Sequence, residues 1–503
     1  MSLRYPIRIL LLGLGLGWAF DFLFFNKWPG VSVLIYAFLL LVGLGLALRW
    51  QQVSVRKSGY SLIPLLLLFA AGAMWRANHF LVFLNVMAAM MVLVLLMGNW
   101  AWQSVWELKV QALLLEPMRV SLMSVARAFD VLRWTNQPLR QDLEGKYARF
   151  VPAIIKGLLI SIPILLVLIF LLISADMVFA QWVKQLLSLD KVLEWGFRII
   201  LMLVFGVLAA GGLAFTLLGS SFEPSSQESE APQEPFITLG IIETLIPINL
   251  INVLFMGFML IQVTYLFGGR FNINEQKFTY AQYARRGFAE LVVVAVIIFG
   301  LILLFQGLSR RERPRHRLFF NASATLLLLL TVVLLVSAFK RLALYEAAYG
   351  FTTMRLYPHV FMVWLGVLLV WFVVTLWVAP RRLAMGMMLA AFGFVLTLNI
   401  LNVEDFVVRH NAGRVPQAAS FEVGRVRAPL DLSYITSLSD DAVPAMLAVL
   451  PQFSPECQQE LISHLRERYR RMKHESRHWQ WQSWNYGRWQ AYRALQNYFT
   501  EVQ

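Results

Sequence analysis

The sequence predicts an all-α membrane protein: a bundle of about eleven transmembrane helices followed by a small water-exposed helical domain. Of the 503 residues, 59% are hydrophobic and 15% are charged, and the mean hydropathy is +0.63. One soluble core cannot bury that much apolar surface. Apolar runs long enough to cross the roughly 30 Å of bilayer hydrocarbon recur along most of the chain. After Asn402 the pattern changes to shorter amphipathic segments, which are typical of helices in water.

The apolar runs place the expected spans in order. We expect them at about 6–25, 31–48, 61–75, 79–98, 151–174, 193–218, 243–267, 288–308, 318–338, 358–378 and 383–402. The first run is too long for the apolar region of a signal peptide, so we interpret it as a retained span. The third is short and carries Pro64 near its start; if it were re-entrant, the orientation of every later span would reverse.

Two other segments divide the membrane region. Residues 100–150 mix tryptophan and leucine with regularly placed charges, which suits amphipathic helices lying in the interface plane. Residues 219–235 are rich in Ser, Glu, Gln and Pro and are typical of a flexible acidic linker. We therefore expect an N-terminal transmembrane region at 1–218, the linker at 219–235, a C-terminal transmembrane region at 236–403 and a water-exposed domain at 404–503.

The charge distribution predicts an orientation rather than a nucleic-acid partner. The chain has 44 basic and 29 acidic residues, a net charge of +15, and 12 and 11 of these lie from Glu404 onward. The remaining excess of 32 over 18 falls mostly in loops between spans, where cations favour the cytoplasmic side and pair with anionic lipid headgroups. We expect the N-terminus in the cytoplasm and the C-terminal domain outside it, although seven basic residues do not follow the rule, namely Arg270, Lys277, Arg285, Arg286, Lys340, Arg341 and Arg355. The single Cys457 excludes an intrachain disulfide.

The C-terminal region carries signals for amphipathic helices. Ser454-Pro455-Glu456 resembles a helix start, and an apolar stripe follows it at helical spacing. The stretch from Trp479 to Phe499 is dense in Trp and Tyr. Such rings either fill a small helical core or rest against the headgroup layer, and Tyr492, Leu495 and Phe499 favour the core because they keep helical spacing.

One stretch of this region matches a zinc-protease motif. His474, Glu475 and His478 fit H-E-x-x-H, in which two histidines one turn apart bind zinc. Both histidines fall on the face opposite the apolar stripe, and Arg477 places a cation between them. We therefore interpret the match as a charged helix surface and expect no metal, no cofactor and no catalytic residues.

Polar side chains within the spans are the first candidate site, because burying them in hydrocarbon is costly unless they are paired or hydrated. The richest segment contains Glu243, Asn249, Asn252 and Gln262, with Pro247 freeing backbone carbonyls. These side chains spread around the helix, so packing between helices explains them as well as a substrate site does.

A second candidate is a polar vestibule at the membrane edge. The first segment carries Tyr283, Arg286 and Glu290 on one helical face, and a second segment repeats the pattern with basic, aromatic and acidic groups, namely Arg341, Tyr345, Glu346 and Tyr349. On the same side of the membrane, the two faces would form an aromatic-lined vestibule able to hold a lipid headgroup or a peptide. The alternative is a pair of amphipathic linkers anchored at the interface by Tyr and Arg.

These stretches resemble a known family. The segments are 243–269, 280–291, 341–352, 398–405, 438–444 and Trp484-Asn485. Together they resemble the bacterial polytopic family catalogued as domain of unknown function 4173, except that Asn402-Val403-Glu404-Asp405 stands where that family has Asn-Pro-Asp. The resemblance implies a bacterial inner-membrane protein without an assigned activity and supplies no catalytic residues.

Three functions stay open on the sequence. We favour a non-enzymatic sensing, scaffolding or regulatory role, in which the C-terminal domain binds a protein partner or folds against the vestibule. Membrane lipids are the other expected partners. The main alternative is a transporter or lipid translocator, and the third is a zinc-dependent membrane hydrolase.

Overall fold

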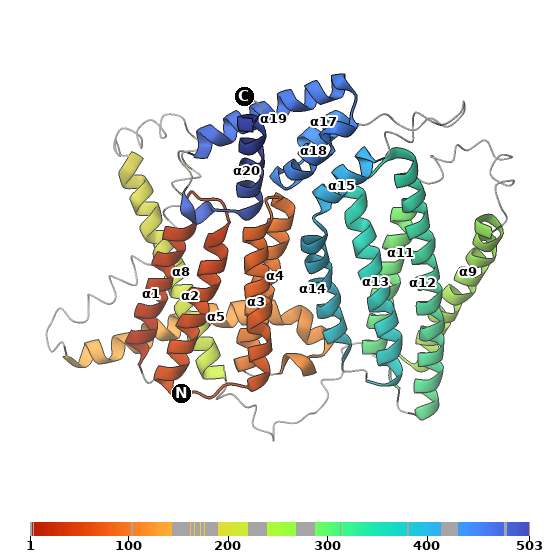
Figure 1. Cartoon of the computed structure of the whole chain (residues 1–503). Helices are drawn as coiled ribbons and strands as arrows, with labels where there is room; N and C mark the ends of the chain where they lie inside the picture. The colour runs from red at the N-terminus through yellow and green to blue at the C-terminus, as the bar shows by residue number, and fades with distance from the viewer. Residues whose placement is uncertain are drawn as a thin grey trace.

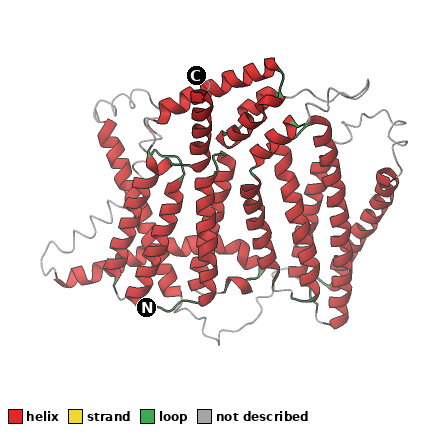
Figure 2. Ribbon diagram, in the orientation of Figure 1, coloured by secondary structure: helices red, strands yellow, loops and turns green. Residues whose placement is uncertain are grey.

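The computed structural model shows a layer of long helices with a small helical domain on one end of it (Figure 1). It describes residues 3–501 except 4, 102–103, 143–189, 220–238, 268–286, 312, 380–381, 414–430 and 477–479. Five isolated positions within 143–189 are also described. Within these ranges the chain is helical, and the only β pairing is an isolated bridge between Leu239 and Ser309 (Figure 2). The predicted all-α class is confirmed.

Ten helices among the described residues are long and apolar enough to cross a membrane. The helices that contain them are α1 (Pro6–Phe24), α2 (Val31–Gln51), α3 (Leu62–Trp75, preceded by the 3-10 turn η1, Lys57–Ser61), α4 (His79–Ala101), α8 (Asp190–Gly219), α9 (Ile241–Phe267), α11 (Phe288–Leu308), α12 (Pro314–Tyr349), α13 (Thr353–Trp377) and α14 (Leu383–Leu401). Each coincides with a predicted span, and the predicted span at 151–174 lies outside the described residues. The short third span packs against α2 and α4 and, together with η1, is one of these ten helices (Figure 1).

The α12 helix is much longer than its predicted span of 318–338. Its 36 residues extend for about 54 Å at 1.5 Å per residue, well beyond the hydrocarbon thickness. The last turns, from Lys340 to Tyr349, continue the helix toward the C-terminal domain (Figure 1). The second predicted vestibule segment is therefore the projecting end of a transmembrane helix, not a separate linker.

Small residues allow α1 and α8 to pack closely. A side chain at Gly17 would place its Cβ 2.2 Å from the Met202 carbonyl oxygen, and one at Gly13 would lie 2.5 Å from the Gly206 carbonyl oxygen. The spacing Gly13-x-x-x-Gly17 is the small-residue pattern that lets membrane helices approach backbone to backbone. At the end of this contact nearer the C-terminal domain, buried Asp21 accepts a 2.7 Å hydrogen bond from Arg198 of α8.

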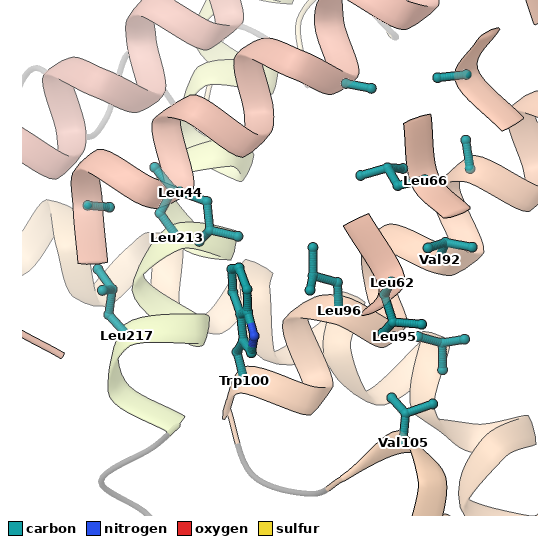
Figure 3. Close-up of a cluster of buried hydrophobic side chains, with 14 of the residues drawn as sticks. Leu44, Leu62, Leu66, Val92, Leu95, Leu96, Trp100, Val105, Leu213 and Leu217 are labelled. Carbon is teal, nitrogen blue, oxygen red and sulfur yellow. The ribbon is translucent and has the colours of Figure 1, made fainter. Parts of the chain in front are cut away.

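Two large apolar clusters lie in the part of the bundle that the structure describes. One includes residues of α1, α2, α3, α4, α8 and α14, and its leucines surround Trp100 (Figure 3). The other joins α9, α11, α12 and α13 around Phe320 and Phe372. Because α14 contributes Ala384, Met388 and Val395 to the first cluster and packs on α13, it links the two halves.

The predicted segment 100–150 contains one long helix among its described residues, α5 (Val110–Asp142), which lies across the ends of the spans away from the C-terminal domain (Figure 1). Leu113, Val120 and Val131 are buried against the bundle, whereas Leu114 and Leu122 on the other side are exposed. An apolar outer surface beside the ends of membrane helices fits the interface plane that the amphipathic pattern indicates.

The described part of the C-terminal domain contains five helices: α15 (Val403–Ala412), α17 (Leu432–Ser437), α18 (Val443–Val449), α19 (Pro455–Ser476) and α20 (Tyr486–Glu501). Short 3-10 turns η5 (Asp440–Ala442), η6 (Leu450–Gln452) and η7 (Trp481–Ser483) connect them. The predicted stripe on α19 buries Leu461, Leu465 and Met472, and Leu495 of α20 is fully buried. The aromatic stretch supplies part of the core through α20, as its helical spacing predicts, whereas Trp481 and Trp484 are exposed beside the membrane helices.

Candidate functional site

The most developed polar site lies where the C-terminal domain meets the ends of the membrane helices. The α3–α4 turn, the α14–α15 turn, η5 and the start of α20 converge there. We call this the polar junction and define it by Arg76, Asn78, Asn85, Asn399, Glu404, Ser439, Asp441, Arg468 and Asn485.

One amide side chain in the junction joins two helix ends. The buried Asn485 donates from Nδ2 to the carbonyl oxygen of Arg76 at 2.7 Å and to that of Ala73 at 3.3 Å, at the end of α3. Its Oδ1 accepts from the backbone N–H of Arg488 at 3.1 Å, at the start of α20. Carbonyls at a helix end and N–H groups at a helix start lack intrahelical partners, so Asn485 caps both helices at once.

Asp441 caps the start of α4. Its Oδ2 accepts from the backbone N–H groups of Ala77 at 2.8 Å and Asn78 at 3.0 Å, just before that helix begins. A carboxylate is favourable there because the helix start carries partial positive charge. Gly487 makes room for it, since a Cβ at that position would lie 2.1 Å from Asp441 Oδ1. Burial raises the pKa of Asp441 above its usual range, against the opposing effect of the two N–H donors.

Glu404 connects the membrane helices with η5. Its side chain is only 4% exposed. Its Oε1 accepts from Asn78 Nδ2 at 2.6 Å, and its Oε2 accepts from the backbone N–H of Ser439 at 3.0 Å and from the Ser439 hydroxyl. Burial raises the pKa of Glu404, and these donors oppose the rise because they favour the charged form.

An amide pair continues the junction into the bundle. Asn85 of α4 and Asn399 of α14 exchange two hydrogen bonds of 2.9 Å, each Nδ2 donating to the other Oδ1. Each Nδ2 also donates to a carbonyl of its own helix, Leu81 or Val395. Arg76 donates from Nε to the Asn399 carbonyl oxygen at 2.9 Å, and burial lowers its pKa. Every polar group of the pair is therefore satisfied across the boundary between the two halves.

Two guanidinium groups complete the junction in the C-terminal domain. Arg468 of α19 donates from Nη2 to the carbonyl oxygens of Leu438 at 2.7 Å and Thr436 at 3.1 Å, at the end of α17. Asp440 lies 4.0 Å from Arg468 and 3.8 Å from Arg488. One carboxylate thus faces two guanidinium groups, and burial lowers the pKa of Arg468.

The arrangement is suited to holding the domain in place. Both oxygens of Glu404 and Oδ2 of Asp441 accept hydrogen bonds from this chain, and the Asn485 amide is used on both sides. Within the described ranges, no three His, Cys, Asp or Glu side chains gather closely enough to hold a metal ion. The junction is a hydrogen-bonded contact between the C-terminal domain and the membrane helices.

The candidate residues of α9 do not meet at one place. Glu243 accepts from the Gly240 N–H at 2.8 Å and caps the start of α9. Asn249 is exposed, whereas Asn252 is buried and donates to the Ser323 carbonyl oxygen of α12 at 3.0 Å. The Asn252 contact joins two helices, and the side chain of Gln262 lies outside the described residues.

The predicted vestibule residues lie at the ends of α11 and α12 that point toward the C-terminal domain. Glu346 is buried and 3.1 Å from Nδ1 of His359 on α13, and Tyr345 stacks under the guanidinium of Arg355 at 4.3 Å. Arg341 reaches Gly287, while Glu290 and Tyr349 are exposed. Tyr283 and Arg286 lie outside the described residues. Glu346 thus faces α13 rather than an open vestibule.

The H-E-x-x-H match lies at the end of α19. That helix ends at Ser476, and His474 and Glu475 are both exposed on it. His478 lies outside the described residues.

The junction itself was not among the candidate sites, although several of its residues stand in motifs that carried the family resemblance. Asn399 and Glu404 belong to the stretch 398–405, Ser439 and Asp441 to 438–444, and Asn485 follows Trp484. Their shared signal is a polar residue close to the end of a helix or a 3-10 turn. That signal marks helix caps in general and does not reveal which caps meet.

The spans, the docked helical domain and the junction define a multi-pass α-helical membrane protein. The chain belongs to the family described as Domain of unknown function (DUF4153), whose model matches residues 63–449. The match contains the junction from Arg76 to Asp441, and Arg468 and Asn485 follow it. The resemblance to family 4173 was therefore wrong: this is a different family, and short polar motifs between apolar helices did not distinguish the two. No curated protein and no solved structure matches the chain.

Proposed function

We propose that this protein is a non-enzymatic membrane sensor or regulator, in which the polar junction couples the C-terminal domain to the bundle. The supporting observation is that Asn485 and Asp441 cap the facing ends of α3, α4 and α20. A displacement of the domain would remove the caps of two membrane helices. A partner that binds and displaces the domain would therefore change the stability of those helix ends in the bundle.

The proposed partner surface is the outer face of α19. This face is exposed and net basic toward its end, with Arg466, Arg470, Arg471 and Lys473. A partner would then present acidic groups, because opposite charge steers association.

For orientation, we propose a cell-membrane protein, in a bacterial inner membrane, with a cytoplasmic N-terminus and an extracytoplasmic C-terminal domain. The exposed Arg310, Arg313, Arg315 and Arg317 lie at the ends of α11 and α12 away from that domain. Two exceptions on the domain side are engaged within the chain: Arg355 donates to the Gly350 carbonyl oxygen at 2.6 Å, and the Arg341 guanidinium lies beside Gly287. Arg270, Lys277, Arg285 and Arg286 lie outside the described residues. Among the described loops between the spans, exposed basic residues thus lie on the side away from the domain, and loop cations orient membrane helices.

The orientation is tested by labelling single cysteines in a Cys457→Ser background. Ser463→Cys on exposed α19 is expected to react with a membrane-impermeant maleimide in intact spheroplasts. Ser54→Cys, exposed between α2 and α3, is expected to react only after lysis. The reversed pattern would contradict the orientation.

The coupling is tested by hydrogen exchange of the full chain in nanodiscs. Asn485→Ala removes the shared cap, and we expect the amides of Arg76, Ala77 and Asn78 to exchange roughly fivefold faster, since a lost cap costs about 1 kcal/mol. Asn497→Ala, an exposed asparagine on the same helix, is the matched control. Faster exchange in α20 with unchanged exchange at residues 76–78 would refute coupling.

Transport receives less support from the described residues. The candidate polar groups of α9 serve a helix cap, the lipid-facing surface and a contact with α12, so they do not line one path.

A further inference from the structure

A groove beside the polar junction has the form of a lipid site. It has a volume of about 250 Å³ and lies between the α1–α2 loop, the first turns of α4 and the η7–α20 segment. Trp28, His79, Ser483 and Arg488 line its upper part. Val82, Phe83 and Val86 continue it down α4.

The groove changes from polar to apolar in the direction of the membrane normal. His79 is the first residue of a transmembrane helix, and Val82, Phe83 and Val86 follow on the same face over about 10 Å. Its upper end therefore lies at headgroup level and its lower end at the level of the first methylenes. The volume is too small for a whole lipid, so it would hold the headgroup region while the tails stay in the bilayer.

The charge at the upper end favours an anion. Arg488 shares its nearest carboxylate, Asp440, with Arg468, at 3.8 and 4.0 Å. The Oδ2 of Asp441, behind the groove wall, accepts from two backbone N–H groups. Asp440 lies 3.8 Å from Arg488, beyond hydrogen-bonding distance, so the guanidinium that lines the groove has N–H donors to offer a phosphate, and guanidinium groups bind phosphate through several such donors.

Aromatic side chains complete the headgroup level. Trp28 is 62% exposed and packs edge-on against His79, with ring centroids 5.2 Å apart. Exposed Trp481 and Trp484 follow nearby in the chain segment that lies on the α1–α2 loop, where the Val31 N–H donates to the Trp484 carbonyl oxygen. Amphipathic rings of this kind are typical of the headgroup layer.

We propose that this groove binds an anionic glycerophospholipid, its phosphate beside Arg488 and its upper acyl chain along Phe83. The lipid would contact Ala77 of the α3–α4 turn and Ser483 of the C-terminal domain together. It would therefore hold the domain on the bundle. This site is independent of the proposed acidic partner on α19.

Native mass spectrometry of the full chain in detergent tests the site, after titration with phosphatidylglycerol and with phosphatidylcholine of the same acyl chains. We expect phosphatidylglycerol to bind roughly tenfold more tightly, and Arg488→Gln to remove that preference. Arg470→Gln, an exposed arginine of the same domain, is the matched control and should bind like the wild type.

Two further measurements separate lipid binding from a loss of folding and from binding of phosphate alone. Trp28→Ala changes an exposed residue outside the domain core, so it should weaken lipid binding without lowering the unfolding temperature. Inorganic phosphate at millimolar concentration should not displace the lipid. Equal affinity for the two lipids, wild-type binding by Arg488→Gln, or displacement by phosphate alone would overturn the proposal. Failure here would leave the exchange experiment on Asn485 unaffected.

Discussion

The amide pair between α4 and α14 allows a quantitative test of how the two halves of the bundle are joined. Asn85 and Asn399 exchange two hydrogen bonds of 2.9 Å within the transmembrane helices. Hydrogen bonds between membrane helices average about 0.6 kcal/mol, and an unsatisfied buried partner costs about 1–3 kcal/mol. We therefore expect Asn399→Ala to destabilise the protein by about 2–3 kcal/mol, since it removes both bonds and leaves Asn85 Oδ1 without its donor.

A double-mutant cycle separates the pair from the packing that alanine removes. Asn85→Ala and the double variant complete the cycle, and we expect a coupling energy of about 1 kcal/mol, the sum of two average bonds. The free energy of unfolding is measured by titrating mixed micelles with a denaturing detergent and following Trp fluorescence. Asn249→Ala, an exposed asparagine of α9, is the control and should change the stability by less than about 0.5 kcal/mol.

The cycle can refute the reasoning. Additive effects of the two substitutions, within about 0.3 kcal/mol, would mean that the amides do not act on each other. A large effect of Asn249→Ala would mean that any asparagine in these helices matters, whatever it contacts.

Three further predictions concern helix packing and the junction. Gly17→Val in α1 should separate α1 from α8, because its Cβ would lie 2.2 Å from the Met202 carbonyl oxygen; we expect a loss of at least about 3 kcal/mol in the same unfolding assay, whereas Gly15→Val, where nothing lies within 4 Å, should be tolerated. Asp441→Ala should leave the Ala77 and Asn78 N–H groups without an acceptor and cost about 2 kcal/mol, and a variant as stable as the wild type would contradict the capping role. The folded-state pKa values of Glu404 and Asp441 lie above the ordinary 4.5 and 3.8, so the folded protein binds more protons at these two groups than the unfolded chain does. The free energy of unfolding should therefore rise as pH falls from neutral toward those values. Thermal unfolding across pH should show that this part of the rise is absent from the Glu404→Gln/Asp441→Asn variant.

The sequence was most informative where the structure depends on local composition. Apolar runs of about twenty residues predicted every membrane helix that the structure describes, because hydrocarbon thickness sets their length. The stripe on α19 likewise predicted buried Leu461 and Leu465. The length of α12 was underestimated, since its last turns carry Lys340, Arg341 and Glu346 and no longer match an apolar run.

The candidate sites were less predictable because a polar residue in a membrane helix requires a hydrogen-bond partner, and the sequence pattern does not identify which residue that partner is. Asn252 was singled out and does contact another helix, but it does not share a site with Glu243. Glu346 was assigned to an open face and instead pairs with His359, which lies thirteen residues away across a helix reversal. Periodicity places a residue on a face, and only packing decides what covers that face.

By itself, the sequence determined that this chain is an all-α membrane protein with a long amphipathic helix and a helical C-terminal domain, since these features follow from hydrophobic period and length. Only the tertiary structure decided that Asn485 caps α3, more than four hundred residues earlier, and that Asp441 caps α4. The physical reason is that a helix end exposes unpaired N–H and carbonyl groups whatever its sequence. Which side chain satisfies them depends on the helix ends that packing brings together.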